Sequence, residues 1–329
     1  MYKKCLKSSG IKHIFLQVSF QMIFFWIQHT GMASFLLALN IFLSITASLG
    51  NALILVALHK ETSLHPPTKL LFRCLAVTDL CVGTIAQPVF AFVRLSSTTN
   101  KVSWEVINYM DRLRIVSAFV LCQVSIFTSS AISVDRLQAL LSGLRYRQVV
   151  TLLRVRAVLI CFWLFGMSCA SICFWSLSIA SNVAFALIIL SLTTSVFSYS
   201  KIYWKLRQHQ LQLSAVQQPN RGRQMPLNVA RFKKSVSSIL WVQMASVTCY
   251  IPYIIVQVFL MPYGQTYGLG KYQTIFYLAL TLMYLNSSLN PILYCWRIRE
   301  VRQAAKEAIK QLKCCCWFII DLALEWIIL

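Results

Sequence analysis

Residues 70–94 read LLFRCLAVTDLCVGTIAQPVFAFVR, and they give the clearest indication of the fold class. From Cys74 to Val93 it contains one charged side chain, that of Asp79. A helix of roughly 20 apolar residues spans a bilayer core about 30 Å thick, so the segment is long enough to cross a membrane. A charge at mid-membrane costs about 2.5 to 3.5 kcal/mol even on lenient insertion scales. Asp79 is therefore a candidate functional residue inside a membrane helix.

The composition of the whole chain extends this interpretation. Hydrophobic residues make up 58% of the 329 residues and charged residues only 12%, which is too apolar for a soluble domain. Turn or charge signals separate seven segments of membrane-spanning length, near 34–58, 70–94, 107–137, 153–177, 182–206, 232–261 and 272–295. We therefore predict an all-α fold, a seven-transmembrane helix bundle in the lipid bilayer.

The distribution of basic residues predicts the orientation. The formal net charge is +22, and Lys and Arg concentrate in alternate gaps and in the tail, for example at Arg145, Arg147, Lys201, Arg223 and Lys306. The positive-inside rule places these gaps and the C-terminus in the cytoplasm and the N-terminus outside. Because the basic clusters lie between apolar runs, anionic lipid suits them better than nucleic acid, which we do not expect as a partner.

The two ends of the chain are predicted separately from the helix bundle. Residues 1–33 form an N-terminal extension whose apolar stretch 14–27 follows four lysines, which fits a signal peptide or anchor, a dispensable segment before Met32, or an eighth span. The bundle covers residues 34–296, and residues 297–329 form a cytoplasmic part. Within that part, 297–313 is typical of a short amphipathic eighth helix at the membrane surface. Cys314, Cys315 and Cys316 follow it, either palmitoylated or unmodified.

The spans carry an ordered set of polar, aromatic and kinking residues. In order they are Gly50-Asn51, Leu75-Ala76-Val77-Thr78-Asp79, Asp135-Arg136-Leu137, Trp163, Tyr199, Cys249-Tyr250-Ile251-Pro252 and Asn290-Pro291-Ile292-Leu293-Tyr294. This set resembles the rhodopsin-like (class A) G-protein-coupled receptors from about residue 34 to 312. The resemblance implies a plasma-membrane receptor that passes the signal of an extracellular ligand to a heterotrimeric G protein.

The resemblance also implies a buried sodium site as the one bound ion, with no other cofactor expected. Asp79 and Ser125 would be ligands, with Asn51, Asn286, Ser287 and Asn290 as the supporting network. Oxygen ligands suit a hard cation. The alternative is a hydrogen-bonded group of purely structural importance.

The activation switch implied by the resemblance centres on Asp135 and Arg136, although Leu137 stands where the family usually has Tyr. An ordinary charge pair at a helix end is the alternative. Pro252 and Pro291 each remove a backbone donor and kink a helix. By resemblance, the sixth helix then moves outward while Tyr199 and Tyr294 turn towards Arg136. Tyr250 stands where the family usually has Trp beside the hinge.

Several departures from the family's usual residues narrow the choice of ligand class. Asp111 replaces the usual Cys of the third helix, the gap near 178–181 is short and lacks Cys, and Ser191 replaces a Pro. These departures are similar to the subgroup of melanocortin, cannabinoid and lysophospholipid receptors. Ala118 stands where amine receptors have an acid. The expected pocket is apolar and aromatic and comprises Ala118, Phe119, Cys122, Tyr253, Gln257, Tyr277 and Tyr284. Such a lining favours a lipid-like, nucleoside-like or small peptide ligand.

Other functions fit the sequence less well. A retinal photoreceptor needs a Lys in the seventh segment, which has none from Tyr272 to Cys295. We expect no enzyme, because the five His do not cluster with carboxylates at metal-ligand spacing. A transporter or channel would show repeated halves or rings of charge, and the sequence has no obvious duplicated pattern. A receptor-like protein that no longer signals remains a further alternative.

Overall fold

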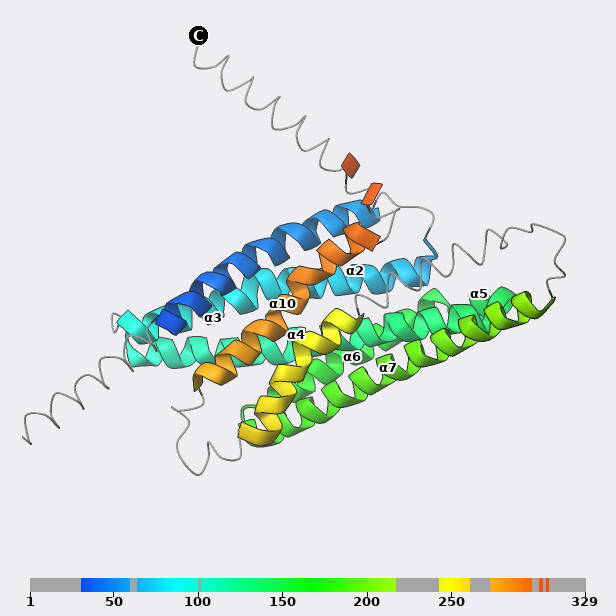
Figure 1. Ribbon diagram of the computed structural model, residues 1–329. Coiled ribbons are helices and arrows are strands. Elements are labelled where there is room, and N and C mark those ends of the chain that lie inside the picture. The colour runs from blue at the N-terminus through cyan, green and yellow to red at the C-terminus, as the bar shows by residue number, and fades with distance from the viewer. Residues whose placement is uncertain are drawn as a thin grey trace, which may run out of the picture.

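The structure is a computed structural model, and it describes residues 31–59, 64–99, 102–216, 243–260, 273–297, 302–303 and 306–307. Within these ranges the chain forms seven long helical segments (Figure 1). They are the first helix Gly31–His59, then α2 Pro66–Cys81 continued by η1 Val82–Ala86 and α3 Gln87–Thr99, α4 Trp104–Ser142, α6 Leu152–Ile172, α7 Leu177–Val216, the sixth helix Gln243–Phe259, and α10 Gln273–Arg297. Between α4 and α6 lie the short turns η2 Gly143–Arg145 and α5 Tyr146–Val149.

Local sequence explains several helix ends. Pro66 and Pro67 open α2, where a missing backbone donor does no harm. Gly143 ends α4 with a φ of 50°, a left-handed value that Gly adopts without strain. Thr151 caps α6 by accepting a hydrogen bond from the Arg154 backbone N–H at 3.4 Å.

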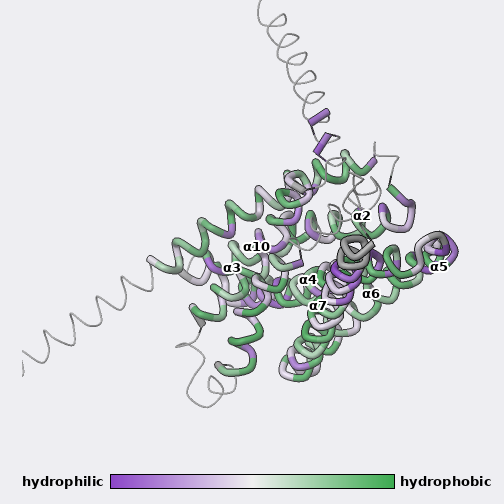
Figure 2. Tube along the Cα trace, turned by 45° about the vertical axis from the view of Figure 1, so that its right-hand side comes forward, coloured by the Kyte–Doolittle hydropathy of each residue, from purple (hydrophilic) through white to green (hydrophobic). Residues whose placement is uncertain are grey.

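Five described helices are long and apolar enough to cross a membrane: Gly31–His59, Pro66–Ser97, Trp104–Ser142, Leu152–Ile172 and Leu177–Gln208. Among the described residues the sixth helix is a shorter apolar helix, and α10 contains the polar run Asn286-Ser287-Ser288 and Asn290. Many outward side chains are large and apolar, such as Leu49, Phe197 and Leu153. In Figure 2 the helices are mostly hydrophobic along their length, which suits an apolar solvent.

Helix α4 organises the bundle, because it contacts α2, α3, α6 and α7. Two buried clusters surround it. The first, called the lower cluster from here on, includes Leu75, Ile132, Tyr199 and Tyr294. The second, called the upper cluster, includes Phe90, Cys122, Tyr250 and Tyr284. Both clusters consist of side chains from helices far apart in sequence, so the bundle depends on tertiary packing.

The predicted spans are found with shifted ends. The second extends over 66–99 instead of 70–94, with the π-helical segment η1 inside it, and so Arg94, the last residue of the predicted span, lies within the helix. The fourth ends at Ile172 instead of 177, and the fifth begins at Leu177 instead of 182. Of the predicted eighth helix, residues 302–303 and 306–307 are described and helical; Cys314, Cys315 and Cys316 lie outside the described residues.

Candidate functional site

Asp79 is fully buried near the end of α2, and it joins three helices. Its Oδ1 accepts hydrogen bonds from Ser125 Oγ of α4 at 2.9 Å and Ser287 Oγ of α10 at 2.8 Å. Asn290 Nδ2, also on α10, donates to Oδ2 at 2.6 Å. The carboxylate thus has three donors, as a buried charge requires. The structure thus brings Asp79, Ser125, Ser287 and Asn290 together, while their role as a sodium site stays a prediction.

The two remaining asparagines have different surroundings. Asn51 reaches the cluster indirectly, since its Nδ2 donates to the backbone oxygen of Ser287 at 3.0 Å. Asn286 Oδ1 instead accepts a hydrogen bond from Ser246 Oγ on the sixth helix at 2.8 Å. Asn286 therefore links the sixth helix to α10, a contact that the sequence did not predict. Ser246 is a further buried residue of the site.

Asp135 and Arg136 form an ion pair near the far end of α4. Asp135 Oδ2 accepts from Arg136 Nε at 3.1 Å, from Arg136 Nη2, and from Thr68 Oγ1 of α2 at 3.0 Å. Tyr146 of α5 donates its hydroxyl to Asp135 Oδ1 at 2.6 Å. Arg136 Nη2 also donates to Thr68 Oγ1 at 2.7 Å. The pair is thus held by two residues, Thr68 and Tyr146, that the sequence prediction of the switch did not include.

Tyr146 is the first residue of the short helix α5 and stays protonated at physiological pH. Burial, together with the adjacent Asp135 carboxylate, raises the pKa of Tyr146 to about 12. Its ring also lies 5.1 Å from that of His65, measured between ring centroids. The signal that could have identified it is the family-like segment Leu144-Arg145-Tyr146-Arg147, whose third residue is the donor.

Tyr199 and Tyr294 are buried together in the lower cluster, among Leu75 and Ile132. Tyr294 packs edge-on against Phe72 at 5.3 Å between ring centroids. Among the described residues, no hydrogen-bond partner is found for the Tyr294 hydroxyl. These two phenols therefore lie in a buried, mostly apolar cluster between the Asp79 group and the Asp135 group.

The two prolines lie in helices as predicted, and each lies beside a distinct structural feature. Pro291 sits inside α10 where the first helix approaches closely, because a Cβ on Gly50 would lie 2.9 Å from Pro291 Cγ. Pro252 lies in the sixth helix, which continues into the π-helical segment η3 Val256–Leu260. Beside it, Tyr250 is fully buried and donates its hydroxyl to the backbone oxygen of Cys122 at 3.2 Å. Tyr250 therefore ties the sixth helix to α4.

Most of the expected ligand-pocket residues lie together. Ala118, Cys122, Tyr277 and Tyr284 belong to the upper cluster, and Tyr253 packs against it. No described cluster includes Phe119 or Gln257, which are partly buried. This grouping leaves the pocket itself a prediction.

Two arginines near this group were not expected, since the predicted lining has no charge. The Arg94 guanidinium lies 4.3 Å above the ring centre of Tyr277. Arg114 is buried in α4, pairs with Asp111 at 2.7 Å, and lies within electrostatic range of Tyr277 and Tyr284. The expected uncharged pocket is thus bordered by two guanidinium groups and a carboxylate. Arg114 was missed because the prediction assigned it to the start of the third segment.

The described cysteines behave as small apolar residues. Eight are free thiols: Cys74, Cys81, Cys122, Cys161, Cys169, Cys173, Cys249 and Cys295. All eight lie in helices or in the turn after α6. Inside the spans a free cysteine packs as a small hydrophobe.

An apolar bundle with buried carboxylates at two depths defines a multi-pass membrane protein of the seven-helix class. Comparison with known families is specific: the profile described as 7 transmembrane receptor (rhodopsin family) matches residues 50–182 and 170–294. These matches cover more than half of the chain. The chain therefore belongs to the rhodopsin family of seven-transmembrane receptors, whose members are signalling receptors and not enzymes.

Individual relatives lie in one branch of that family. The chain is 27% identical over 296 residues to melanocortin receptor 4 of Danio rerio, covering 86% of this chain and 85% of the relative. It is 24% identical over 289 residues to melanocortin receptor 5 of Rattus norvegicus and over 293 residues to that of Homo sapiens, covering 86% of each chain. The resemblance to a melanocortin-like subgroup is thereby confirmed.

Proposed function

We propose that this receptor binds an extracellular ligand between its helices and activates a heterotrimeric G protein through outward movement of the sixth helix. The observation that carries the proposal is the Asp135–Arg136 pair, held by Thr68 and Tyr146 at one end of the bundle. The exposed Arg145 and Arg147 lie at the same end. By the positive-inside rule that end is cytoplasmic, which puts the N-terminus outside and the C-terminus in the cytoplasm of a plasma-membrane protein.

The proposed mechanism exchanges partners of Arg136. In the structure Arg136 is bound to Asp135 and Thr68. A G protein that offers backbone carbonyls or a carboxyl terminus can replace these partners once the sixth helix has moved. Pro252, followed by η3, gives the sixth helix a bend at which to move. The contacts of Tyr250 with Cys122 and of Ser246 with Asn286 then have to rearrange.

The direct test is agonist-independent activation of a panel of G proteins by the intact chain and by the chain without residues 1–31. Arg136→Ala is expected to reduce that activity to background, whereas Arg156→Ala, an exposed arginine of α6 at the same end, should leave it unchanged. Equal activity of wild type and Arg136→Ala would refute coupling through this residue. Silence of both chains at high surface expression and with a ligand panel would favour the alternative, a receptor-like protein that does not signal.

We further propose that Asp79 binds a sodium ion. The hydroxyl oxygens of Ser125 and Ser287 both lie within hydrogen-bond distance of the Asp79 carboxylate, and oxygen atoms are the ligands that a hard cation prefers. Asn51 Oδ1 is a buried oxygen without a hydrogen-bond partner among the described residues, so the surroundings still have acceptor capacity. When bound, the ion would supply a positive charge that neutralises Asp79. Sodium would then stabilise the arrangement in which α2, α4 and α10 meet.

Neighbouring serines offer a matched test of the sodium site. Ser287→Ala removes a hydroxyl at Asp79, whereas Ser288→Ala removes one that donates to the Leu43 backbone oxygen at 3.0 Å. We expect sodium to raise the apparent Tm of the wild type and of Ser288→Ala, and to raise it much less in Ser287→Ala and Asp79→Asn. Equal sodium sensitivity in wild type and Asp79→Asn would leave a structural hydrogen-bonded group as the explanation.

The ligand is proposed to lie at the upper cluster, between α4, the sixth helix and α10. Lipid-like, nucleoside-like and peptide ligands all fit an apolar and aromatic lining. Because Arg94 and Arg114 border it, those bearing a hydrogen-bond acceptor or an acid are favoured. The relatives are named as melanocortin receptors, so melanocortins are the first ligands to test. Binding that survives Tyr277→Ala and Tyr284→Ala without loss would exclude this cluster.

A further inference from the structure

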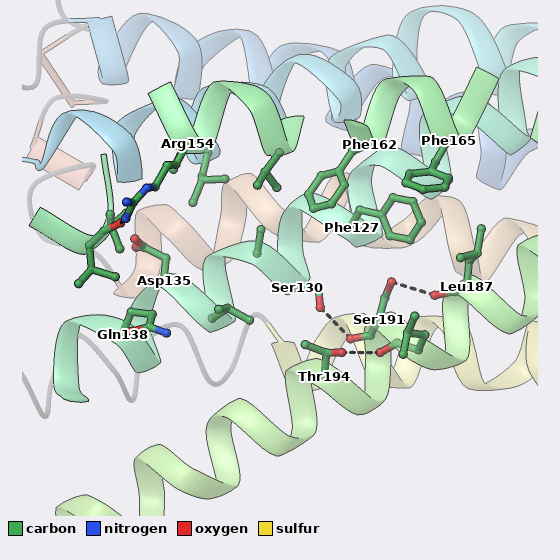
Figure 3. A pocket seen from close by; sticks show the side chains of 18 residues that line it. Phe127, Ser130, Asp135, Gln138, Arg154, Phe162, Phe165, Leu187, Ser191 and Thr194 are labelled. Atoms are coloured by element: carbon green, nitrogen blue, oxygen red, sulfur yellow. Dashed lines mark hydrogen bonds between the residues drawn. The ribbon is translucent and has the colours of Figure 1, made fainter. Parts of the chain in front are cut away.

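A groove separate from the expected ligand pocket runs along the lipid-facing side of the bundle (Figure 3). Its volume is about 580 Å³, within the range of roughly 300 to 1,000 Å³ typical of sites for small molecules. Its walls come mainly from α4, α6 and α7, with Leu71 of α2 and Val149 and Val150 at one end. None of the seven expected pocket residues lines it.

The groove is apolar along most of its length and borders the bilayer. Phe127, Phe162 and Leu187 form part of its walls. Phe165 and Leu190, also part of the lining, are more than half exposed at 56% and 61%. In a membrane protein such exposed side chains face lipid and not water. An occupant of this groove therefore enters from the bilayer.

One end of the groove is polar. Figure 3 shows Arg154, Asp135 and Gln138 at this end, whereas Phe162 and Phe165 lie towards the other. Asp135 is neutralised by its ion pair with Arg136. Arg154 is exposed, and its Nη1 donates to the Val149 backbone oxygen at 2.7 Å, one use among the five N–H donors of a guanidinium. The cationic group at this end can thus donate to a further acceptor.

The groove lies at headgroup depth at its polar end and in the hydrocarbon at its other end. The polar end is the cytoplasmic one in the proposed orientation, since the exposed Arg145 and Arg147 lie between α4 and α6, close in sequence to Val149, Val150 and Arg154 of the lining. Basic sites between membrane helices on that side suit anionic headgroups, because the cytoplasmic leaflet is rich in anionic lipid. Charge and shape therefore indicate the same kind of occupant.

We propose that the groove binds an anionic phospholipid of the cytoplasmic leaflet, with one acyl chain between α4, α6 and α7 and the phosphate on Arg154. The acyl chain covers Phe127, Phe162 and Leu187, and the phosphate accepts hydrogen bonds from the guanidinium. The proposal goes beyond ligand binding and G-protein coupling, but it rests on the proposed orientation of the chain. Lipid binding is measured without any G protein, so its failure and a failure of coupling are distinguishable.

Photolabelling of the full-length receptor tests the proposal. The receptor is placed in phosphatidylcholine nanodiscs with a trace of phosphatidylserine that carries a diazirine in one acyl chain, or with the matching phosphatidylcholine probe. Mass spectrometry then locates the labelled peptides. We expect the phosphatidylserine probe to label peptides containing 127–134, 158–165 and 187–194 about fivefold more than the phosphatidylcholine probe, the ratio that one basic residue near a headgroup gives.

Matched variants separate specific binding from ordinary contact with lipid. Arg154→Gln is expected to remove most of the preference for phosphatidylserine, Arg154→Lys to restore it, and Arg156→Gln to leave it intact. Val158→Trp, which fills the groove, should lower labelling by both probes, whereas Ile160→Trp on the same helix but outside the lining should not. An apparent Tm within a few degrees of wild type shows that each variant is folded.

Three results would overturn the proposal. Equal labelling of the groove by the two probes would mean ordinary boundary lipid without headgroup recognition. An equal loss of preference in Arg154→Gln and Arg156→Gln would mean a diffuse effect of surface charge. Labelling spread evenly over other lipid-facing helices, and unaffected by Val158→Trp, would mean that the groove holds no particular lipid.

Discussion

Removing one hydroxyl from Tyr146 should raise the basal activity of this receptor. Tyr146 donates to Asp135 Oδ1 at 2.6 Å, and Asp135 in turn binds Arg136. In the proposed mechanism this bond is made only in the inactive arrangement, because activation separates Arg136 from Asp135. Tyr146→Phe keeps the ring packed near His65 and deletes only the donor. The inactive arrangement should therefore lose stability while the active one does not.

The size of the effect follows from the hydrogen bond. A bond to a charged group contributes about 1.5 to 3 kcal/mol. Tyr146 is only half-buried, so water can partly replace it, and we take the lower limit of that range. Since every 1.4 kcal/mol is a tenfold change in an equilibrium constant, the ratio of active to inactive receptor should rise about tenfold.

The pH range over which this bond acts follows from the raised pKa. Folding raises the pKa of Tyr146 from 10.0 to about 12, so the stabilisation from the protonated phenol is fully present below pH 10. It is lost as the pH rises through about 12. The hydrogen bond is thus intact at neutral pH, and the difference between wild type and Tyr146→Phe should not change with pH below 10.

Agonist-independent G-protein activation at matched surface expression measures the ratio. Tyr203→Phe is the matched control, because Tyr203 is an exposed tyrosine on α7. Thr68→Val should also raise basal activity, since Thr68 Oγ1 donates to the same carboxylate at 3.0 Å. If Arg136→Ala abolished activity but Tyr146→Phe matched wild type and Tyr203→Phe, Tyr146 would not restrain the switch.

Two further predictions concern stability. Gly50→Ala places a Cβ 2.9 Å from the rigid ring of Pro291, so it should destabilise the fold by about 1 to 3 kcal/mol, seen as a lower apparent Tm in detergent. Gly166→Ala is the control and should cost much less, because a Cβ at Gly166 would lie 3.3 Å from a Val124 methyl group. An equal loss of stability in the two variants would contradict the close approach of the first helix to α10. Asp111→Asn leaves buried Arg114 without its partner, but the Asp111 side chain is 37% exposed, so we expect a loss of only about 1 kcal/mol. Glu105→Gln on the exposed first turn of α4 is the control, and an equal Tm for both variants would show that the ion pair contributes no stability.

The Asp79 group was predictable because the helices lie in lipid and not in water. In an apolar span each polar side chain needs a partner, and Asp79, Ser125 and Asn290 lie at comparable depth on three helices. The rotation of the helices was not predictable. Successive helical residues point about 100° apart, so Ser287 faces Asp79 while its neighbour Asn286 faces Ser246 on the sixth helix. Depth can be counted along a sequence, but the facing direction depends on how neighbouring helices pack.

The partners of Asp135 were not predictable for a different reason. Thr68 and Tyr146 lie near the starts of α2 and α5, where polar side chains are ordinary and need no buried partner. Arg94 and Arg114 were likewise expected near the ends of spans. Instead, the stacking of Arg94 on Tyr277 and the pairing of Arg114 with Asp111 bring both charges against the upper cluster.

The Asp79 group and the Asp135 group are separated by a packed layer that any signal between them has to cross; it is mostly apolar, but in it Ser129 and Ser133 donate to Gln243 of the sixth helix. Ser125 and Asp135 are ten residues apart on α4, about 15 Å at 1.5 Å per residue, so neither group can contact the other directly. Between them lie Leu75, Ile132, Tyr199 and Tyr294 in one buried cluster. The polar groups are largely satisfied by their own hydrogen bonds, whereas the buried Tyr294 hydroxyl has no partner among the described residues. A buried hydroxyl without a partner costs about 1 to 3 kcal/mol, so an arrangement that gives Tyr294 a polar partner gains this energy when the layer opens. The packed layer thus resists the change and its phenol favours it, which is the balance that a two-state element requires.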